Sequence, residues 1–489
     1  MDQLPVSTGA SVRESCGIFG VYAPNEEVAR LAFFGLYALQ HRGQESSGIA
    51  TADGTKIRLH AAMGLVAQVF TEAILDQLRG DIAIGHNRYS TTGSSRRFNA
   101  QPIIVPSPQG EIALAHNGNI VNAEYLRKEL EGKGFTFSTT TDSEVIVRLI
   151  ASAPRESMVE RIKYAMSRLV GAYSLVILTR DKLFGVRDPM GVRPLSLGSL
   201  NGHGWVIASE TCALDHLGAE LLREVEPGEV VEVGGDGVNS FKGGTADKKA
   251  LCIFEYIYFA RPDSLINGRR IYQARWAMGE QLAREYPLAA DMVIGVPDSA
   301  TAAGIGYSLA SGIPYSEALL KNRYVGRTFI EPEQRLRDLG VKLKFNPMND
   351  VISGKRLVVV DDSIVRGTTT PQVINLLRRA GAKEVHMCIC APPIRHPCFF
   401  GVDMATRGEL IAARKKVPEI AEWIGADSLG YLSVDGLIKA VNLPMELFCL
   451  ACFTGDYPVP VQLEMDKLAM ETHHLAGKDK DFCERVEGK

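Results

Sequence analysis

The sequence predicts two domains: a first α+β domain that mixes strands with helices, and a second α/β domain built on a parallel sheet. The chain has 489 residues, which exceeds the size of an ordinary single domain. A stretch rich in glycine and charge, residues 234–249, marks the expected boundary. Beyond it, apolar β-branched runs alternate with helical patterns, which is typical of buried parallel strands.

Composition narrows the class of protein. Hydrophobic residues make up 46% and charged residues 23% of the chain, an ordinary globular mixture. The formal net charge of -3 gives no support for a nucleic-acid or membrane-binding surface. No apolar run approaches the length of a membrane span, and the polar leader over residues 1–15 lacks the hydrophobic region of a secretory signal. We therefore expect a cytoplasmic protein without nucleic-acid or membrane partners.

The first domain opens with a predicted strand, GIFGVYA (17–23), followed by a helix that runs to about Leu39. Asn25 is expected to cap that helix. Residues 41–50 read as a polar loop that leads into another strand. Three further elements are predicted: strands at 81–87 and 111–116, and a helix beginning near Ser143, capped by Asp142 or a neighbouring threonine.

In the second domain, residues 292–296 and 356–360 are apolar runs of the kind found in buried parallel strands. Pro371 suits the first turn of the helix that follows, and Gly381 suits its end. Residues 384–391 predict the next strand. A sheet of this kind binds ligands beyond the carboxyl ends of its strands, so the loops at those ends are the candidates for function.

The strongest local pattern is RLVVVDDSIVRGTTT (356–370), where Asp361 and Asp362 end a strand and a short loop leads into a helix. Backbone N–H groups of that loop, the hydroxyls of Thr368 and Thr369, and the helix N-terminus can surround a phosphate. The two acids would repel phosphate, so we expect them to face ribose hydroxyls or a magnesium ion.

This string resembles the phosphoribosyl pyrophosphate (PRPP) motif of type I phosphoribosyltransferases. IGVPDSA (294–300) is similar to the pyrophosphate loop of the same family. The resemblance implies that Ser299 joins Asp361 and Asp362 around magnesium. It implies PRPP contacts at Asp361, Asp362, Ser363, Arg366, Gly367, Thr368 and Thr369.

KNRYVGRTFI (321–330) and the segment that continues to about Lys344 resemble the mobile catalytic loop of that family. The resemblance makes Lys321, Arg323 and Lys344 cations near the leaving pyrophosphate, where negative charge develops in the transition state. Each basic residue by itself would more simply be a solvated surface charge. We expect the loop to close over PRPP, exclude water and couple the two sites.

The first domain carries a set of residue types suited to amide hydrolysis. Cys16 supplies a thiol, although a cysteine at the start of a strand is otherwise a small core residue. Asn117 and Gly118, expected in a turn, can offer an amide and a backbone N–H to an oxyanion. Arg88 can hold a carboxylate and Asp142 an ammonium group, the two charged ends of an amino acid substrate.

The sequence pairs no histidine with Cys16 in an obvious way, yet a thiol needs a base to become a nucleophile. If residues 1–15 were removed, the new α-amine of Cys16 would have an unperturbed pKa of about 7.7–8.0. That amine could take the proton from the thiol. Cys16 is therefore expected to act only as the first residue of a processed chain.

The strings CGIFGVY, LQHRGQESSGIA, GHNRYSTTG, HNGNI and TDSE resemble the class II glutamine amidotransferases, whose nucleophile is N-terminal. This resemblance implies an αββα sandwich for the first domain. Over residues 12–460 the whole chain resembles the glutamine phosphoribosylpyrophosphate amidotransferases. The family reaction converts PRPP, glutamine and water into 5-phosphoribosylamine, glutamate and pyrophosphate, the first step of purine synthesis.

The family resemblance also implies a domain plan, an assembly and a form of regulation. Purine nucleotides are the expected feedback inhibitors, and a homotetramer is the expected assembly. The domain plan is a propeptide at 1–15, a glutaminase domain at 16–240, a phosphoribosyltransferase domain at 250–465 and a tail at 466–489.

Nine cysteines, an odd number in an apparently cytoplasmic chain, favour metal binding or catalysis over a disulfide framework. Cys449 and Cys452 form a CxxC pair, which by itself fits a metal knuckle, a redox pair or chance. Four thiolates would suit either zinc or an iron–sulfur cluster, and sequence spacing does not decide between them. Resemblance to the propeptide-bearing branch implies a [4Fe–4S] cluster, with zinc as the alternative. The implied ligands are Cys252, Cys398, Cys449 and Cys452.

Two rival interpretations remain at this point. Another class II amidotransferase, such as one that aminates a sugar phosphate, would share the first domain but would need a different second one. A PRPP-sensing regulatory protein would keep the phosphate loop, but it would not need Cys16 and its neighbours and would be expected to carry a DNA-binding region.

Overall fold

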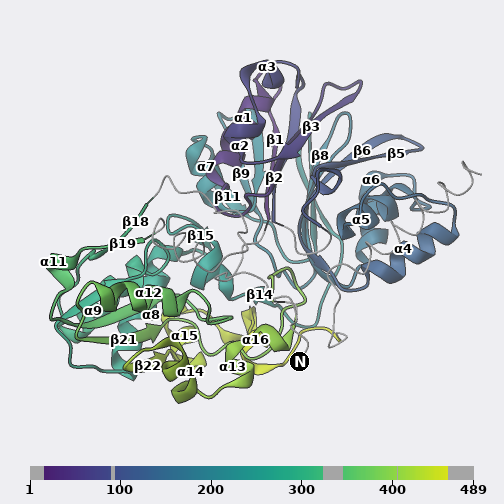
Figure 1. Cartoon of the computed structure of the whole chain (residues 1–489). Coiled ribbons are helices and arrows are strands. Elements are labelled where there is room, and N and C mark those ends of the chain that lie inside the picture. The colour runs from purple at the N-terminus through teal and green to yellow at the C-terminus, as the bar shows by residue number, and fades with distance from the viewer. Residues whose placement is uncertain (1–15, 90–93, 323–344, 405, 461–489) are drawn as a thin grey trace, which may run out of the picture.

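The computed structural model describes residues 16–89, 94–322, 345–404 and 406–460. The first domain has four layers, with two antiparallel sheets face to face and helices on both outer faces (Figure 1). One sheet has the order β11-β9-β10-β1-β4-β2-β3 and the other the order β13-β12-β8-β7-β6-β5. This is the αββα sandwich predicted for the first domain.

The bounds of the first sheet are β1 Gly17–Tyr22, β2 Ser46–Ala52, β3 Ile57–Met63, β4 Ile82–Arg88, β9 Ser196–Leu200, β10 Gly204–Ala208 and β11 Glu220–Glu224. Those of the second are β5 Ile103–Ser107, β6 Gly110–Ile120, β7 Gly171–Leu178, β8 Leu183–Arg187, β12 Glu229–Gly234 and β13 Gly237–Lys242. The helices of this domain are α1 Val28–Ala38, α2 Val66–Val69, α3 Glu72–Leu75, α4 Ala123–Gly132, α5 Asp142–Ala151, α6 Met158–Met166 and α7 Thr211–His216.

Strand β1 shows how the layers form. Side chains alternate across a strand, so Ile18 belongs to the core between the two sheets while Phe19 and Val21 belong to the core beneath α1. All three are fully buried. A strand covered on both faces must be apolar throughout, which accounts for the continuous run GIFGVY.

Two expectations about local structure are wrong. Asn25 does not cap the first helix: α1 begins at Val28 with Glu27 at its N-cap, and Asn25 has a φ of 70° in the turn before it. Asparagine tolerates this left-handed conformation, so its role there is to make the turn. The glycine-rich boundary stretch is only partly a linker, because Gly234 and Gly237 close the β12–β13 hairpin and β13 continues to Lys242.

The second domain contains a parallel sheet of order β17-β20-β21-β22, as the apolar runs predict. Its strands are β17 Met292–Gly295, β20 Arg356–Asp361, β21 Glu384–Ile389 and β22 Ser428–Tyr431. Its helices are α8 Ile271–Glu285, α9 Thr301–Ser311, α11 Asn349–Ile352, α12 Thr370–Arg379, α13 Ile411–Arg414, α14 Val417–Ile424, α15 Val434–Val441 and α16 Ala451–Thr454. Short strand pairs join β14 Leu251–Cys252 to β23 Phe448–Cys449, β15 Leu265–Ile266 to β16 Arg269–Arg270, and β18 Leu319–Lys321 to β19 Phe345–Pro347.

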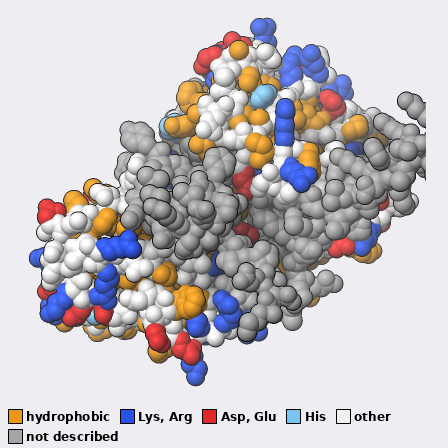
Figure 2. All heavy atoms as spheres, in the orientation of Figure 1, with side chains coloured by type: hydrophobic (Ala, Val, Ile, Leu, Met, Phe, Trp, Pro, Cys, Tyr) orange, Lys and Arg blue, Asp and Glu red, His pale blue; other side chains and the backbone are white. Residues whose placement is uncertain are grey.

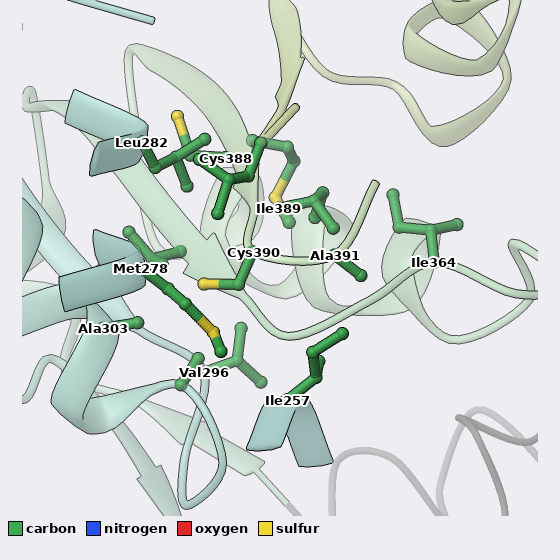
Figure 3. Close-up of a cluster of buried hydrophobic side chains, with 14 of the residues drawn as sticks. Ile257, Met278, Leu282, Val296, Ala303, Ile364, Cys388, Ile389, Cys390 and Ala391 are labelled. Carbon is green, nitrogen blue, oxygen red and sulfur yellow. The ribbon is translucent and has the colours of Figure 1, made fainter. Parts of the chain in front are cut away.

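Cys388 and Cys390 belong to the core of the second domain. Figure 3 shows both among apolar side chains that include Met278, Leu282 and Val296. Their relative exposures are 0% and 3%, so neither thiol is available to a ligand at the surface. Burial raises the pKa of Cys388 to about 12, as expected for an inert core thiol.

Two features of the structure bear on the partners expected from composition: the distribution of surface charge and the character of the helices. Figure 2 shows acidic and basic side chains interspersed with apolar ones over the visible face rather than gathered into one basic field. Within the described parts of the chain, no helix has the length and apolar character needed to cross a membrane.

Candidate active sites and the cysteine group

Pairing between β1 and β4 places Cys16 beside the end of β4, because Gly17 lies opposite Asn87. The Cys16 thiol donates a hydrogen bond to the carbonyl of Tyr89 at 3.2 Å, and the Tyr89 N–H approaches the sulfur at 3.4 Å. Cys16 is buried, and burial raises the pKa of its thiol to about 11. The thiol is therefore protonated at neutral pH, and nucleophilic attack requires a base.

A small pocket opens beside the Cys16 thiol, and most of its lining is polar. Four of the five predicted glutaminase residues contribute to it. They come from the residue before β1 and from β4, β6 and α5, which are far apart in the sequence. The full lining is Cys16, Arg88, Tyr89, Gln101, His116, Gly118, Thr141, Asp142 and Ser143.

Arg88 and Asp142 give the pocket one positive and one negative group. Arg88 is almost fully buried at the end of β4, where its Nη1 donates to the Ser94 carbonyl at 3.0 Å and lies 3.8 Å from the Glu45 carboxylate. Asp142 begins α5 and accepts a hydrogen bond from the Ile120 N–H at 3.1 Å. A zwitterionic amino acid needs such a pair of opposite charges.

The predicted turn at the oxyanion residues is wrong, because Asn117 and Gly118 lie inside β6, hydrogen-bonded along β7. Gly118 has a φ of 151°, and a Cβ there would lie 2.0 Å from the Ala172 carbonyl oxygen. Only glycine fits this close approach of two backbones. Asn117 does not line the pocket, and within the described residues its buried side-chain oxygen and nitrogen have no hydrogen-bond partner.

Five residues that line the pocket were not predicted from the sequence: Tyr89, Gln101, His116, Thr141 and Ser143. All except Gln101 sit within or next to the quoted motifs, which was the available signal. His116 places its Nδ1 3.1 Å from the Ser143 hydroxyl, and Gln101 accepts a hydrogen bond from the His116 N–H at 2.9 Å. Burial lowers the pKa of His116, so its ring is neutral at pH 7.

At the carboxyl end of β20, the structure brings together four predicted magnesium and PRPP residues. The Ser299 hydroxyl donates to Asp362 at 2.5 Å, and Asp361 accepts a hydrogen bond from the Asp362 N–H at 2.9 Å. The Ser363 hydroxyl donates to the other oxygen of Asp362 at 2.6 Å. Carboxylate and hydroxyl oxygens at one sheet edge are suitable ligands for magnesium.

The phosphate loop ends at α12, with Thr369 at the N-cap and Gly367 in the left-handed region at a φ of 67°. Thr368 is exposed and so is open to a ligand. Arg366 instead pairs with Glu409, a residue the sequence argument did not single out, with Nε to Oε2 at 2.8 Å. Arg366 would have to exchange or share this partner to bind a phosphate.

Of the predicted catalytic-loop cations, Lys321 lies at the end of β18 and forms an ion pair with Asp298 at 2.8 Å. Asp298 belongs to the predicted pyrophosphate loop, so Lys321 is held beside that loop. Arg323, Lys344 and the whole segment between them lie outside the described residues.

Residues 398–404 lie between the two candidate sites. Asn119 of β6 donates to the Phe399 carbonyl at 2.9 Å, and a Cβ on Gly401 would lie 3.0 Å from the Gly118 carbonyl carbon. The Tyr89 hydroxyl reaches Asp403 at 3.3 Å, and Arg366 donates to the Asp403 carbonyl at 3.4 Å. A chain of contacts therefore runs from the Cys16 pocket to the phosphate loop.

The four cysteines of the predicted cluster converge from three distant segments. Parallel pairing of β14 with β23 sets Cys252 opposite Cys449. Burial, together with the neighbouring thiols of Cys252 and Cys398, raises the pKa of Cys449 to about 12. Cys452 interacts electrostatically with the other three thiols. All four are free thiols.

Two observations bear on whether these thiols fit a metal centre. Against a centre, the described residues contain no group of three or more His, Cys, Asp or Glu side chains whose positions would hold a metal ion. In favour of a centre, the buried Arg193 lies in the electrostatic field of Cys252 and Cys398, and its Nε has no partner within the described chain. A buried cation suits a ligand set that becomes anionic when thiols ionise.

Comparison with known proteins agrees with this geometry. A family model described as a glutamine amidotransferase domain matches residues 86–216. The chain is 52% identical over 466 residues to an amidophosphoribosyltransferase of Synechococcus elongatus, with 94% of each chain covered. It is 47% identical over 455 residues to that of Bacillus subtilis, covering 92% of this chain and 95% of the relative.

Solved structures give the same result. The glutamine PRPP amidotransferase from B. subtilis complexed with ADP and GMP matches with a TM-score of 0.87 and 46% identity, covering 92% of this chain and 99% of that one. A structure described as the allosteric regulatory enzyme of purine biosynthesis matches with a TM-score of 0.87 and 47% identity, covering 92% of this chain and 97% of that one.

The sandwich around Cys16, joined to a parallel sheet with acids at its edge, defines a glutamine amidotransferase fused to a phosphoribosyltransferase-type domain. The chain belongs to the amidophosphoribosyltransferase family. This confirms the predicted family and fold class, and it makes the protein a glutamine-dependent pentosyltransferase. Family membership over nearly the whole chain sets aside the two rival interpretations.

Proposed function

We propose that this chain hydrolyses glutamine at Cys16 and transfers the ammonia to C1 of PRPP, which yields 5-phosphoribosylamine, glutamate and pyrophosphate. This is the first step of purine synthesis. The observation that carries the proposal is the coexistence in one chain of two polar sites. One is the Cys16 pocket with Arg88 and Asp142, and the other is the edge of β20 with Asp361 and Asp362.

In the first half-reaction, Arg88 holds the α-carboxylate of glutamine and Asp142 holds its α-ammonium. The Cys16 sulfur attacks the side-chain amide carbon while its proton passes to the α-amine freed by removal of residues 1–15. The Asn117 amide and the Gly118 N–H stabilise the oxyanion. The α-ammonium of Cys16 then returns that proton to the amide nitrogen, so that ammonia leaves and a thioester remains, and water hydrolyses the thioester to release glutamate. The Asn117 side chain supports this role because, within the described residues, its buried amide has no hydrogen-bond partner and so remains available to a ligand.

In the second half-reaction, ammonia displaces pyrophosphate from C1 of PRPP. Ser363, Gly367, Thr368 and Thr369 would hold the 5-phosphate at the start of α12, and the neighbouring acids would contact the ribose. A magnesium ion, when bound through Ser299, Asp361 and Asp362, would neutralise charge on the pyrophosphate. Lys321 would add a positive charge beside the leaving group.

Ammonia released to water at neutral pH would be protonated and lose its nucleophilicity, so we propose that it passes internally. Residues 398–404 contact both sites and would form part of the wall of that passage. Closure of the loop 321–344 over PRPP would couple the two sites, so that ammonia is transferred when PRPP is bound. We also propose that purine nucleotides inhibit the protein, that it assembles as a homotetramer and that it is located in the cytoplasm.

The reaction is tested by its stoichiometry. Protein incubated with PRPP, magnesium and glutamine should release glutamate and pyrophosphate in equal amounts. Ammonium at alkaline pH should replace glutamine and sustain pyrophosphate release. Glutamate released in the presence of PRPP without any pyrophosphate would mean a different acceptor and would overturn the proposal.

We also propose that Cys252, Cys398, Cys449 and Cys452 ligate a [4Fe–4S] cluster, which would tie the C-terminal CxxC segment to two distant parts of the chain. Protein purified without oxygen should then contain iron and acid-labile sulfide in equal amounts. Cys449→Ser should lose both and unfold at a lower temperature, whereas Cys388→Ala, a buried cysteine outside the group, should keep both. Bound zinc without sulfide would contradict the cluster.

A further inference from the structure

A buried network of charges connects Cys16 with the second domain. Its members are two arginines and two glutamates whose side chains have 0% relative exposure: Arg42, Arg193, Glu210 and Glu255. Arg42 lies between α1 and β2, Arg193 between β8 and β9, and Glu210 after β10, all in the first domain. Glu255 comes from η2 (Glu255–Phe259), beyond the domain boundary.

Arg42 is the member that touches the candidate nucleophile. Its Nε donates to the Cys16 carbonyl at 3.1 Å, while Nη1 and Nη2 donate to the two oxygens of Glu255 at 3.0 and 2.9 Å. Nη1 also donates to Glu210 at 2.6 Å. A planar guanidinium held by fork geometry cannot tilt without breaking these bonds, so Glu255 sets the direction from which Arg42 meets Cys16.

The hydrogen bond from Arg42 to the Cys16 carbonyl becomes more important for positioning once Cys16 is the first residue of the chain. An N-terminal residue has no preceding peptide to fix it, and its amine and thiol must both stay free for chemistry. Its carbonyl oxygen is then the one backbone group of that residue left to anchor it. Arg42 holds that oxygen, and the strand begins only at Gly17.

Glu255 is also connected, through Arg193, to the segment that carries Cys398. Arg193 Nη1 donates to Glu255 at 3.1 Å, and its Nη2 donates to the Phe400 carbonyl at 3.0 Å. Phe400 follows Cys398 by two residues, and the Phe400 N–H approaches the Cys398 sulfur at 3.4 Å. Glu255 itself is three residues beyond Cys252 in the sequence.

We infer that Glu255 is a positioning residue for glutamine hydrolysis: it orients Arg42, which fixes the backbone of Cys16, and it ties that orientation through Arg193 to the segment that carries Cys398. Glu255 touches neither substrate nor thiol. The inference rests on the proposed function in one respect, which is that Cys16 is the nucleophile. Glu255 should therefore affect the rate of the chemical step at Cys16 rather than the binding of glutamine.

The test is Glu255→Gln in the full, processed protein, with kcat and KM for glutamine measured separately from ammonia-dependent product formation. Because a misplacement of about 1 Å can cost about 100-fold in rate, we expect kcat for glutamine to fall by at least about tenfold. The KM for glutamine and the ammonia-dependent rate should stay within about threefold of the parent, since neither Arg88 nor the PRPP site contacts Glu255.

Glu229→Gln is the matched control. Glu229 is also a buried glutamate of the first domain, paired with the partly exposed Arg223, and the described residues give it no hydrogen bond or ion pair with the network. Glu255→Asp, which keeps the charge and shortens the reach, replaces Glu255→Gln if that variant does not fold. It should show the same separation of kcat from KM.

The outcomes separate the inference from the proposed function. Parent-like kcat in a folded Glu255 variant, or an equal loss of the ammonia-dependent rate, would overturn the positioning role. A Cys16→Ala protein that still hydrolyses glutamine would overturn the nucleophile assignment whatever Glu255 does. A selective loss of kcat in Glu255→Gln, with Glu229→Gln unchanged, supports the inference.

Discussion

Cys16→Ala should abolish glutamine-dependent product formation while leaving ammonia-dependent formation close to that of the parent. Loss of a covalent nucleophile removes the thioester route entirely, so we expect the glutamine-dependent kcat to fall by at least about 10³-fold. Ammonia supplied from solution needs only the PRPP site, which Cys16 does not touch. The measurement is pyrophosphate release with each nitrogen source at saturating PRPP.

Cys212→Ala is the control for this substitution, because Cys212 is a buried cysteine of the same domain that does not line the Cys16 pocket. It should retain both activities. Glutamine-dependent turnover at the parental rate in Cys16→Ala would mean that another group attacks the amide.

The second large effect is expected at Asp362, where one carboxylate accepts hydrogen bonds from the hydroxyls of Ser299 and Ser363. Asp362→Asn removes a charge that magnesium and the ribose are proposed to use. We expect product formation to fall by about 10² to 10³-fold with either nitrogen source, as for loss of a major electrostatic contact to a transition state. Glutamine hydrolysis measured without PRPP should be unaffected.

Asp291→Asn serves as the comparison, because Asp291 is an acid of the same domain whose carboxylate pairs with Arg356 at the opposite end of β20. It should lower stability slightly and leave turnover unchanged. A Asp362→Asn protein with parental pyrophosphate release would exclude the proposed role of this carboxylate.

The elements that sequence reasoning found are those that local periodicity and capping determine. Apolar runs correctly predicted the strands β1, β17 and β20. Pro371 and Gly381 correctly predicted where α12 begins and ends. Asn117 was misjudged because polar residues near glycine favour turns locally, yet pairing with β7 overrides that preference over the length of β6. Asn25 was misjudged because asparagine suits both a helix N-cap and a left-handed turn position, and the structure uses it in the turn.

The site was predicted as a set of motifs, and the structure adds what joins them. No local pattern predicts that Arg42 and Glu255, 213 positions apart, share a buried ion pair. Nor does any pattern predict that residues 398–404 contact both Tyr89 and Arg366. Such contacts depend on how the two domains pack. In the sequence alone, the charged residues that make them cannot be distinguished from ordinary charged residues at the surface.

We expect Cys16 to hydrolyse glutamine only when it is the first residue, with its own amine as the base. Two samples of the same protein test this requirement, one with the Ser15–Cys16 bond intact and one cleaved there, each verified by intact mass.

The measurement is glutamine hydrolysis by both samples at pH 8, alongside ammonia-dependent product formation. The buried thiol has a pKa raised to about 11, and in the uncleaved chain the nitrogen of Cys16 is part of a peptide bond and cannot serve as its base. We predict that the uncleaved sample does not hydrolyse glutamine, that the cleaved sample does, and that both use ammonia equally. Full glutamine hydrolysis by the uncleaved protein would contradict the account and would turn attention to His116 as the base.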